Sequence, residues 1–279
     1  MIIVYNYGKI IIYGDFMYTK LDLLNDIKNM GLSSDSLLMI HSSFKSIKNI
    51  DGGAISVIEA FKESFKDGLL LFPTHTWNII NNDFDILNKN DSNSCVGYLT
   101  NMVIKDKDFI RSNHPTHSVC AYGKNAFEYI TQDTYSTTPV SPNGSFGKLK
   151  NNGYILFIGC PLSKNTFIHS IEEEMNVKDR FTNHIFTFYV NDNNKLIEFH
   201  MPKHYSTLNP HISDNYEKLL PIMLKLNICK KVKILDSNSY LVNAKKLYNL
   251  VKDILKKDIH AFDDLRDLNK YIDWSKTYD

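Results

Sequence analysis

A histidine and two glutamates in residues 165–173, Asn-Thr-Phe-Ile-His-Ser-Ile-Glu-Glu, are spaced for proton transfer. The stretch has helical spacing, and Glu172 and Glu173 follow His169 by three and four residues, one turn further along. A carboxylate in that place can accept one ring N–H and leave the other ring nitrogen to take a proton. The spacing therefore predicts His169 as a general base, although such pairs are also common on exposed helix faces.

Polar clusters stand next to four short apolar runs that have the length of buried strands. In an open α/β sheet, ligands bind outside the carboxyl ends of the strands, so side chains at several strand ends can line one cleft. Taken singly, each cluster is also explained by ordinary turn and capping chemistry. Together they predict a cleft that binds a polar molecule. The clusters are residues 41–43, 74–77, 111–117 and 165–172.

Two segments have the composition of phosphate-binding turns. Residues 41–44, His-Ser-Ser-Phe, offer successive backbone N–H groups and hydroxyls after a strand, and residues 141–148, Ser-Pro-Asn-Gly-Ser-Phe-Gly-Lys, offer small residues and one cation. The sequence contains no Walker loop, no Gly-x-Gly-x-x-Gly and no Gly-x-Ser-x-Gly, which disfavours nucleotide hydrolysis, dinucleotide redox chemistry and serine hydrolysis. His114 and His117 do not fit a helical metal motif, so we expect no metal.

The order of the periodic segments predicts an α/β fold. Helical patterns at 19–31 and 54–65 alternate with strands at 37–40 and 69–72, which favours a mainly parallel central sheet covered by helices on both faces. An antiparallel hairpin is expected at one edge of this sheet, followed by a C-terminal α/β elaboration. The further expected elements are a long loop at 78–94, a helix at 96–104, a strand at 117–122, a strand at 154–160, a hairpin at 183–190 and 195–200, helices at 213–226 and 243–257, and strands at 231–235 and 240–242.

Residues 1–18 are interpreted as an N-terminal hairpin extension and residues 19–279 as a single domain. Of the 279 residues, 43% are apolar and 23% are charged, as in soluble globular proteins. A net charge of +1 without basic runs argues against nucleic acid and membrane partners. The four cysteines form no Cys-x-x-Cys pair, and free thiols fit a reducing cytoplasm. We expect a cytoplasmic monomer or homodimer.

The clusters, in this order, resemble the aminoglycoside 3-N-acetyltransferase family of antibiotic N-acetyltransferases, which is unrelated to the commoner GNAT acetyltransferases. The resemblance runs from about Thr19 to about Glu174 and resumes weakly at 239–242. Residues 1–18 have no counterpart, and the segment after Glu174 is poorly matched. The stretches that carry the resemblance are Leu-Met-Ile-His-Ser-Ser-Phe-Lys-Ser-Ile at 38–47, residues 52–61, Leu-Leu-Leu-Phe-Pro-Thr-His-Thr-Trp at 69–77, Arg-Ser-Asn-His-Pro-Thr-His-Ser-Val at 111–119, residues 141–149, residues 154–160 and Asn-Thr-Phe-Ile-His-Ser-Ile-Glu at 165–172.

The resemblance implies a CoA-dependent N-acyltransferase that acts on the primary amine of an amino sugar by direct transfer in a ternary complex, with acyl-CoA, most simply acetyl-CoA, as cosubstrate and no metal. It implies His169 as base and Glu172 as its orienting carboxylate. The residues expected to bind the cosubstrate are His41, Ser42, Ser43, Phe44, Ser112 and Ser145. The residues expected to bind the acceptor are Thr74, Thr76, Asp83, His114 and Glu173.

The acceptor is interpreted from charge. An aminoglycoside carries several positive charges and favours an acidic cleft, whereas this chain is nearly neutral. That balance favours a nucleotide-linked amino sugar used in surface-glycan biosynthesis, with aminoglycoside 3-N-acetylation, which confers antibiotic resistance, as the close alternative. Two further hypotheses are an inactive protein that binds CoA or another small molecule, and a metal-dependent phosphate-ester hydrolase that uses the histidines.

Overall fold

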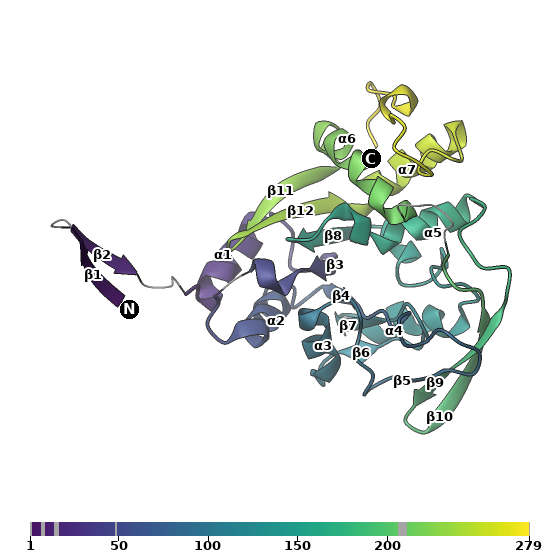
Figure 1. Cartoon of the computed structure of the whole chain (residues 1–279), viewed down its shortest axis with the longest axis horizontal. Coiled ribbons are helices and arrows are strands. Elements are labelled where there is room, and N and C mark those ends of the chain that lie inside the picture. The colour runs from purple at the N-terminus through teal and green to yellow at the C-terminus, as the bar shows by residue number, and fades with distance from the viewer. Residues whose placement is uncertain (1, 7–8, 14–16, 48, 206–210, 279) are drawn as a thin grey trace.

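A seven-stranded sheet forms the centre of the computed structural model, which describes residues 2–6, 9–13, 17–47, 49–205 and 211–278 (Figure 1). The strand order is β11-β12-β8-β3-β4-β7-β6. The three central strands β8, β3 and β4 are parallel, and antiparallel strands flank them on both sides. The bounds are β3 Leu37–Ser42, β4 Leu69–Pro73, β6 Ile110–Arg111, β7 Val119–Gly123, β8 Gly153–Ile158, β11 Cys229–Ile234 and β12 Ser237–Asn243.

The central strands are buried on both faces because helices cover both. Leu38 and Ile40 of β3 pack into the hydrophobic cluster that contains α1, α2 and α3, whereas Met39 between them packs into the cluster that contains α5 and α7. The alternation of side chains along a strand explains this division. The predicted α/β class is confirmed. The helices are α1 Lys20–Asn29, α2 Gly53–Ser64, α3 Tyr98–Lys105, α4 Ala126–Thr131, α5 Thr166–Glu174, α6 Leu220–Lys225 and α7 Ala244–Lys257.

A second, three-stranded sheet lies apart from the central one and corrects one prediction. The hairpin of β9 (Phe186–Asp192) and β10 (Lys195–Met201) is present, but it pairs with β5 (Ile86–Asn88) and not with an edge of the central sheet (Figure 1). The expected loop at 78–94 therefore contains a strand. Alternation of polar and apolar residues indicates a hairpin but does not identify its partner. The cluster that stabilises this sheet is Ile80, Leu87, Phe188, Val190, Phe199 and Met201.

The C-terminal part extends the central sheet through β12, which pairs with β8. The expected helix at 213–226 begins as the 3-10 helix η5 (Ile212–Leu219) and continues as α6, with Pro221 in the first turn of α6. Proline is tolerated in a first turn because the N–H groups there have no partner within the helix. A single α-helix through residue 221 was therefore the wrong interpretation. α7 begins after Asn243, whose side chain accepts a hydrogen bond from Lys246 N.

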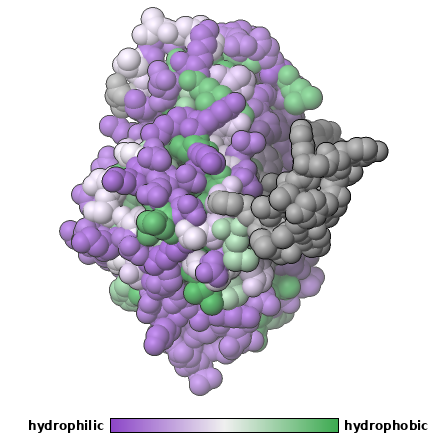
Figure 2. Space-filling view, turned by 90° about the vertical axis from the view of Figure 1, so that its left-hand side faces the viewer, coloured by the Kyte–Doolittle hydropathy of each residue, from purple (hydrophilic) through white to green (hydrophobic). Residues whose placement is uncertain are grey.

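The N-terminal strands β1 (Ile2–Asn6) and β2 (Lys9–Tyr13) pair in antiparallel fashion and stand away from the rest of the ribbon (Figure 1). Residues 7 and 8 of the expected turn lie outside the described residues. Hydrophilic residues dominate the face shown in Figure 2, and apolar residues appear there singly or in small groups. No helix in the described ranges combines the length and apolar character needed to span a membrane.

Candidate active site

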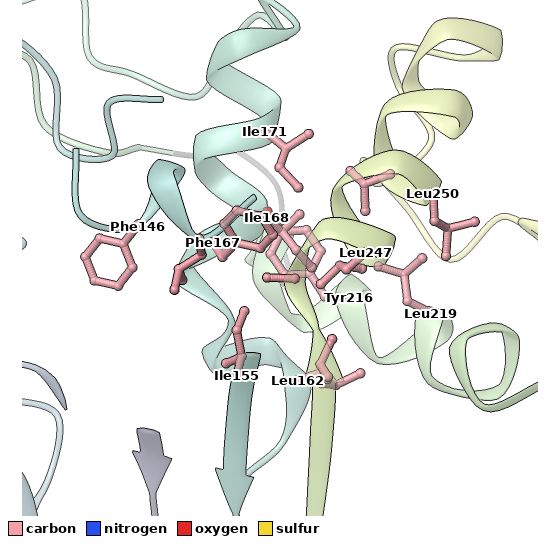
Figure 3. Packing of buried hydrophobic residues seen from close by; sticks show 14 of the residues in the cluster. Phe146, Ile155, Leu162, Phe167, Ile168, Ile171, Tyr216, Leu219, Leu247 and Leu250 are labelled. Atoms are coloured by element: carbon pink, nitrogen blue, oxygen red, sulfur yellow. The ribbon is translucent and has the colours of Figure 1, made fainter. Parts of the chain in front are cut away.

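Helix α5 is fixed by its apolar side, which leaves its polar side chains in defined positions. It follows β8 after a short connection that includes the 3-10 helix Leu162–Lys164. Phe167, Ile168 and Ile171 are buried in the cluster that also contains Tyr216 and Leu247 (Figure 3). A rigid helix holds a side chain more exactly than a loop does. His169 is on this helix, and it borders a cavity of about 1450 Å³.

The predicted pair of His169 and Glu172 is formed. His169 Nδ1 lies 3.0 Å from Glu172 Oε2, and the carboxylate is fully buried. Burial alone would raise the pKa of Glu172, but hydrogen bonds from His169 and Tyr216 and the charge of Arg180 lower it below its ordinary value. Glu172 is therefore ionised at neutral pH and acts as a fixed acceptor for one ring nitrogen of His169.

Two residues that the sequence analysis missed hold this carboxylate from the other sides. Tyr216 donates its hydroxyl hydrogen to Glu172 Oε2 at 2.7 Å, and Arg180 Nε donates to Glu172 Oε1 at 3.0 Å. Arg180 also donates to Asp263 at 2.7 Å. The tyrosine oxygen lies 2.8 Å from His169 Nδ1 and can accept from it, because its own hydrogen points to the glutamate. Nδ1 therefore carries the ring proton, and Nε2 is left with its lone pair.

Other histidines surround the base. The ring of His204 lies against that of His169, with centroids 4.0 Å apart. Ser213 Oγ lies 3.5 Å from His169 Nε2, and both residues line the cavity. Burial lowers the pKa of His204 well below its ordinary value, so His204 is neutral at pH 7. The histidine-rich segment at 200–211 was a signal that the sequence analysis did not use.

The cavity lies at the carboxyl ends of the parallel strands β3, β4 and β8. The expected residues His41, Ser42, Ser43 and Phe44 line it at the end of β3. Burial lowers the pKa of His41 to about 3, and its Nε2 atom has no hydrogen-bond partner among the described residues. The residues that continue this wall at the ends of the other two strands are Pro73, His75, Gly159, Cys160 and Pro161.

Ser112 and Ser145, which we expected to bind the cosubstrate, do not line the cavity. Ser112 is buried, and its hydroxyl accepts a hydrogen bond from Val119 N at 3.0 Å. Ser145 is also buried, and both its N–H and its hydroxyl donate to Asp133 at 2.7 Å. Both hydroxyls stabilise local loops, a role that the sequence pattern does not distinguish from ligand binding.

The expected acceptor-binding residues Thr74, Thr76 and His114 are likewise absent from the cavity wall. Thr74 bonds with Ser118, and Thr76 donates to the carbonyl of Pro115 at 2.6 Å. His114 Nδ1 accepts from two backbone N–H groups, and its Nε2 lies 3.2 Å from the carbonyl of Thr138. Their neighbours face the cavity instead. The neighbours that line it are His75, Trp77, Thr116 and His117.

Asp83 and Glu173 do not border the cavity either. Asp83 accepts from Thr187 N and pairs with His184 at the start of the small sheet. Glu173 accepts from Thr138 at 2.7 Å, and burial raises its pKa. The charged residues that do line the cavity are Lys45, Lys164, Lys203 and Asp214. Among the residues that the structure describes, no group of three or more His, Cys, Asp or Glu is arranged to hold a metal ion.

Comparison with known proteins identifies the family. The model of the aminoglycoside 3-N-acetyltransferase family matches residues 39–256. The chain is 25% identical over 186 residues to the SPbeta prophage-derived aminoglycoside N(3')-acetyltransferase-like protein YokD of Bacillus subtilis (strain 168), covering 59% of this chain and 68% of YokD. It is 26% identical over 160 residues to aminoglycoside N(3)-acetyltransferase IV of Salmonella sp, covering 56% of this chain and 59% of that protein.

Solved structures share the fold. The apoenzyme of aminoglycoside acetyltransferase AAC(3)-IVa superposes with a TM-score of 0.73 at 18% identity, covering 88% of this chain and 92% of that one. The CoASH complex of AAC-IIIb superposes with a TM-score of 0.74 at 17% identity, covering 87% of this chain and 97% of that one. The match of the family model over most of the sequence confirms the predicted resemblance and, at family level, the predicted acyltransferase: the chain belongs to the aminoglycoside 3-N-acetyltransferase family.

Proposed function

We propose that the protein is a CoA-dependent N-acyltransferase that transfers an acyl group, most simply acetyl, from acyl-CoA to the primary amine of an amino sugar. One observation carries the proposal. His169 lines a cavity of about 1450 Å³ while the buried Glu172 holds its Nδ1, which leaves Nε2 for a substrate. A cavity of that size can take two substrates together, and the histidine is oriented to remove a proton from one of them.

The turn after β3 fits the phosphates of the cosubstrate. The hydroxyl-bearing Ser42 and Ser43 and the cation Lys45 line the cavity together, and Lys164 adds a second positive charge on the same wall. Within the described part of the chain, neither lysine forms an ion pair with an acidic residue, so both remain available for phosphate oxygens. The structure of AAC-IIIb, which has a similar fold, was solved in complex with CoASH, and this supports CoA as the cosubstrate.

In the proposed reaction, His169 Nε2 takes a proton from the acceptor ammonium. The freed amine then attacks the thioester carbonyl, a C–N bond forms, the C–S bond breaks, and the departing thiolate takes a proton back from the imidazolium. The second proton that the nitrogen loses as it becomes an amide passes to water. Glu172 keeps the ring oriented and stabilises its positive charge. General-base catalysis of this kind contributes roughly 10²–10⁴-fold, and holding the two substrates in line contributes at least as much.

The relatives favour an aminoglycoside as the acceptor. Several of them are named aminoglycoside N(3)-acetyltransferases, and AAC(3)-IVa has been solved with a gentamicin and with apramycin. We therefore propose the 3-amino group of an aminoglycoside as the first acceptor to test. This choice replaces our preference for a nucleotide-linked amino sugar, which rested on net charge alone.

A nucleotide-linked amino sugar stays a second candidate because of the charges on the cavity. Three lysines and one aspartate line it, and the two acidic residues expected to bind the acceptor, Asp83 and Glu173, bond elsewhere. A polycationic acceptor gains little from such a wall, whereas a pyrophosphate is attracted to it. Lys45 and Lys164 are assigned to the phosphates of the cosubstrate and do not distinguish the two acceptors. The lysine that can distinguish them is Lys203, which is adjacent in sequence to His204, the histidine whose ring lies against His169.

The test is a thiol-release assay with acetyl-CoA and a panel of amines. The panel contains kanamycin, gentamicin, apramycin, glucosamine and a UDP-linked amino sugar. We expect amine-dependent thiol release and an acetylated amide product. The absence of release with every amine, combined with tight binding of CoA, would identify an inactive binding protein. Release of inorganic phosphate from a phosphate ester in the presence of added metal, without thiol release, would identify a hydrolase instead.

The domain division is tested in the same assay. We propose that residues 19–279 form the catalytic unit and residues 1–18 an extension. The chain without residues 1–18 should keep the turnover number and both Michaelis constants of the full chain. A tenfold loss of turnover in a chain that remains folded would assign the extension to the site.

A further inference from the structure

We propose that Ser213, with its hydroxyl hydrogen held by His211, is the second contact of the acceptor ammonium beside His169. The inference rests on the proposed function for the identity of the ammonium group. The arrangement of Ser213, His211 and His169 is independent of that function. Ser213, His211 and His169 all line the cavity. Ser213 is in the first turn of η5, and His211 is the residue that caps this helix.

The first step concerns the proton on His211. The backbone N–H of Ser213 donates to His211 Nδ1 at 3.3 Å, as an N-terminal cap does. Nδ1 is therefore an acceptor and carries no hydrogen. The oxygen of Ser213 lies 2.7 Å from the same Nδ1 atom, so this contact is an O–H···N hydrogen bond in which the serine donates.

The second step concerns the face that Ser213 turns to the base. Because its single hydrogen points to His211, its oxygen offers only lone pairs to other partners. His169 Nε2 also offers a lone pair, because Nδ1 carries the proton that Glu172 accepts. The two acceptor atoms are 3.5 Å apart. Neither can satisfy the other, so the pair is complementary to a group that donates two hydrogens from one atom.

A primary ammonium is such a group. Its nitrogen can lie at a normal hydrogen-bond length of about 2.9 Å from both acceptors. It then gives one N–H to His169, which removes that proton, and a second N–H to Ser213, which holds the nitrogen in place for attack. Ser213 is thus a positioning residue for the amine. It does not act as a nucleophile, because its hydrogen is already bonded to a histidine other than the base.

Kinetics provide the first test. We expect Ser213→Ala to raise the Michaelis constant for the amine about tenfold, since hydrogen bonds to charged groups are strong, and to leave that for acetyl-CoA unchanged. Ser213→Thr, which keeps the hydroxyl, should restore the wild-type constant. His211→Asn keeps an acceptor near the position of Nδ1 and should be mild. His211→Ala should lower turnover, because the released serine hydrogen can then bond to His169 Nε2.

Two results would overturn the inference at this stage. The first is an amine Michaelis constant and a turnover number in Ser213→Ala within twofold of wild type. The second is a mass increase of one acetyl group on Ser213 after mixing the protein with acetyl-CoA in the absence of amine, since this would make the serine a nucleophile. The double variant His211→Ala/Ser213→Ala should be no slower than Ser213→Ala alone, because it has no serine hydroxyl hydrogen that could bond to His169 Nε2.

Nuclear magnetic resonance separates this inference from the proposed function. The ring nitrogens of His169 are followed while glucosamine is added, with N-acetylglucosamine as the control that lacks an ammonium group. We expect a change at Nε2 with glucosamine alone, and its loss in Ser213→Ala. An equal change in both proteins, or none in wild type, overturns the inference. A change in wild type without acetyl transfer to any amine refutes the proposed function while the serine keeps its role.

Discussion

In α5, His169 gives one ring nitrogen to a buried carboxylate and lines a large cavity, whereas His114 in the loop after β6 bonds both ring nitrogens to the backbone and does not line the cavity. The two histidines stand in similar surroundings in the sequence, next to serine, threonine and strand ends. The polar side chains of His114 and Arg111 are nevertheless paired with other protein groups. Arg111, the last residue of β6, donates to three backbone carbonyls of other segments and to Ser118.

The difference shows what separates a site from a polar loop of similar composition. A side chain is available for chemistry when one of its polar atoms remains unpaired on a cavity while the others are held by buried partners. His169 meets both conditions, and His114 meets only the second. The following variants compare the two regions, and the first should have the largest effect.

His169→Asn removes the proposed base. We expect turnover to fall by at least about 10²-fold, because general-base catalysis is lost. Steady-state thiol release measures the effect, and binding of acetyl-CoA by calorimetry serves as control. Turnover near that of wild type would show that His169 is not the base, and His169 would then not differ from His114 in its role.

Glu172→Gln keeps the size of the side chain but removes its charge. Turnover should fall roughly 10- to 50-fold, because the imidazolium that forms on His169 loses the negative partner that stabilises it. The pH–rate profile of turnover is the more specific measurement. A profile identical to that of wild type would show that the carboxylate does not act through the histidine.

The same variant gives a test based on stability. Because the pKa of Glu172 is lowered in the folded protein, its charge stabilises the fold above the ordinary carboxyl pKa of about 4.3, and this stabilisation is lost as the pH falls through the lowered value. The stability advantage of wild type over Glu172→Gln should therefore shrink below about pH 4.3. Urea unfolding at pH 7 and pH 4 measures it, and an advantage that grows on acidification contradicts the assignment.

These comparisons also indicate how far the sequence could lead. The strands and helices that carry the site follow from local periodicity, and the pair of His169 and Glu172 is three residues apart on one helix. The sheet that the β9–β10 hairpin joins depends on a distant partner, β5, which was hidden in a polar stretch. Periodicity contains no information about such pairings.

The site shows the same limit. Tyr216 completes the carboxylate clamp from 44 residues away, and Arg180 does so from the segment beyond the end of α5. No local pattern places them there. Ser112, Ser145 and His114 match family motifs, yet the fold buries them and pairs them with neighbouring groups. Motif spacing identifies which residues approach the strand ends, but not which of their atoms remain unpaired.

Tyr216→Phe tests the clamp with a smaller change. The loss of one hydroxyl leaves Glu172 paired with Arg180 and His169, so we expect turnover to fall about three- to tenfold. The ring stays packed against Phe262, which limits the effect on stability. The pH–rate profile should move, because one of the hydrogen bonds that lower the pKa of Glu172 is removed. An unchanged turnover and profile would make Tyr216 a packing residue only.

His114→Asn should have the smallest effect on catalysis. The asparagine side-chain oxygen can accept from the backbone N–H groups of Thr116 and His117, as Nδ1 does, so the turn is kept and only the contact with Thr138 is lost. We expect a stability loss of about 1 kcal/mol and a turnover within twofold of wild type. Thermal unfolding and the thiol-release assay measure the two quantities. A large fall in turnover at unchanged stability would mean that a histidine bonded through both nitrogens still serves the reaction, and the distinction between unpaired and consumed polar atoms would then fail for this protein.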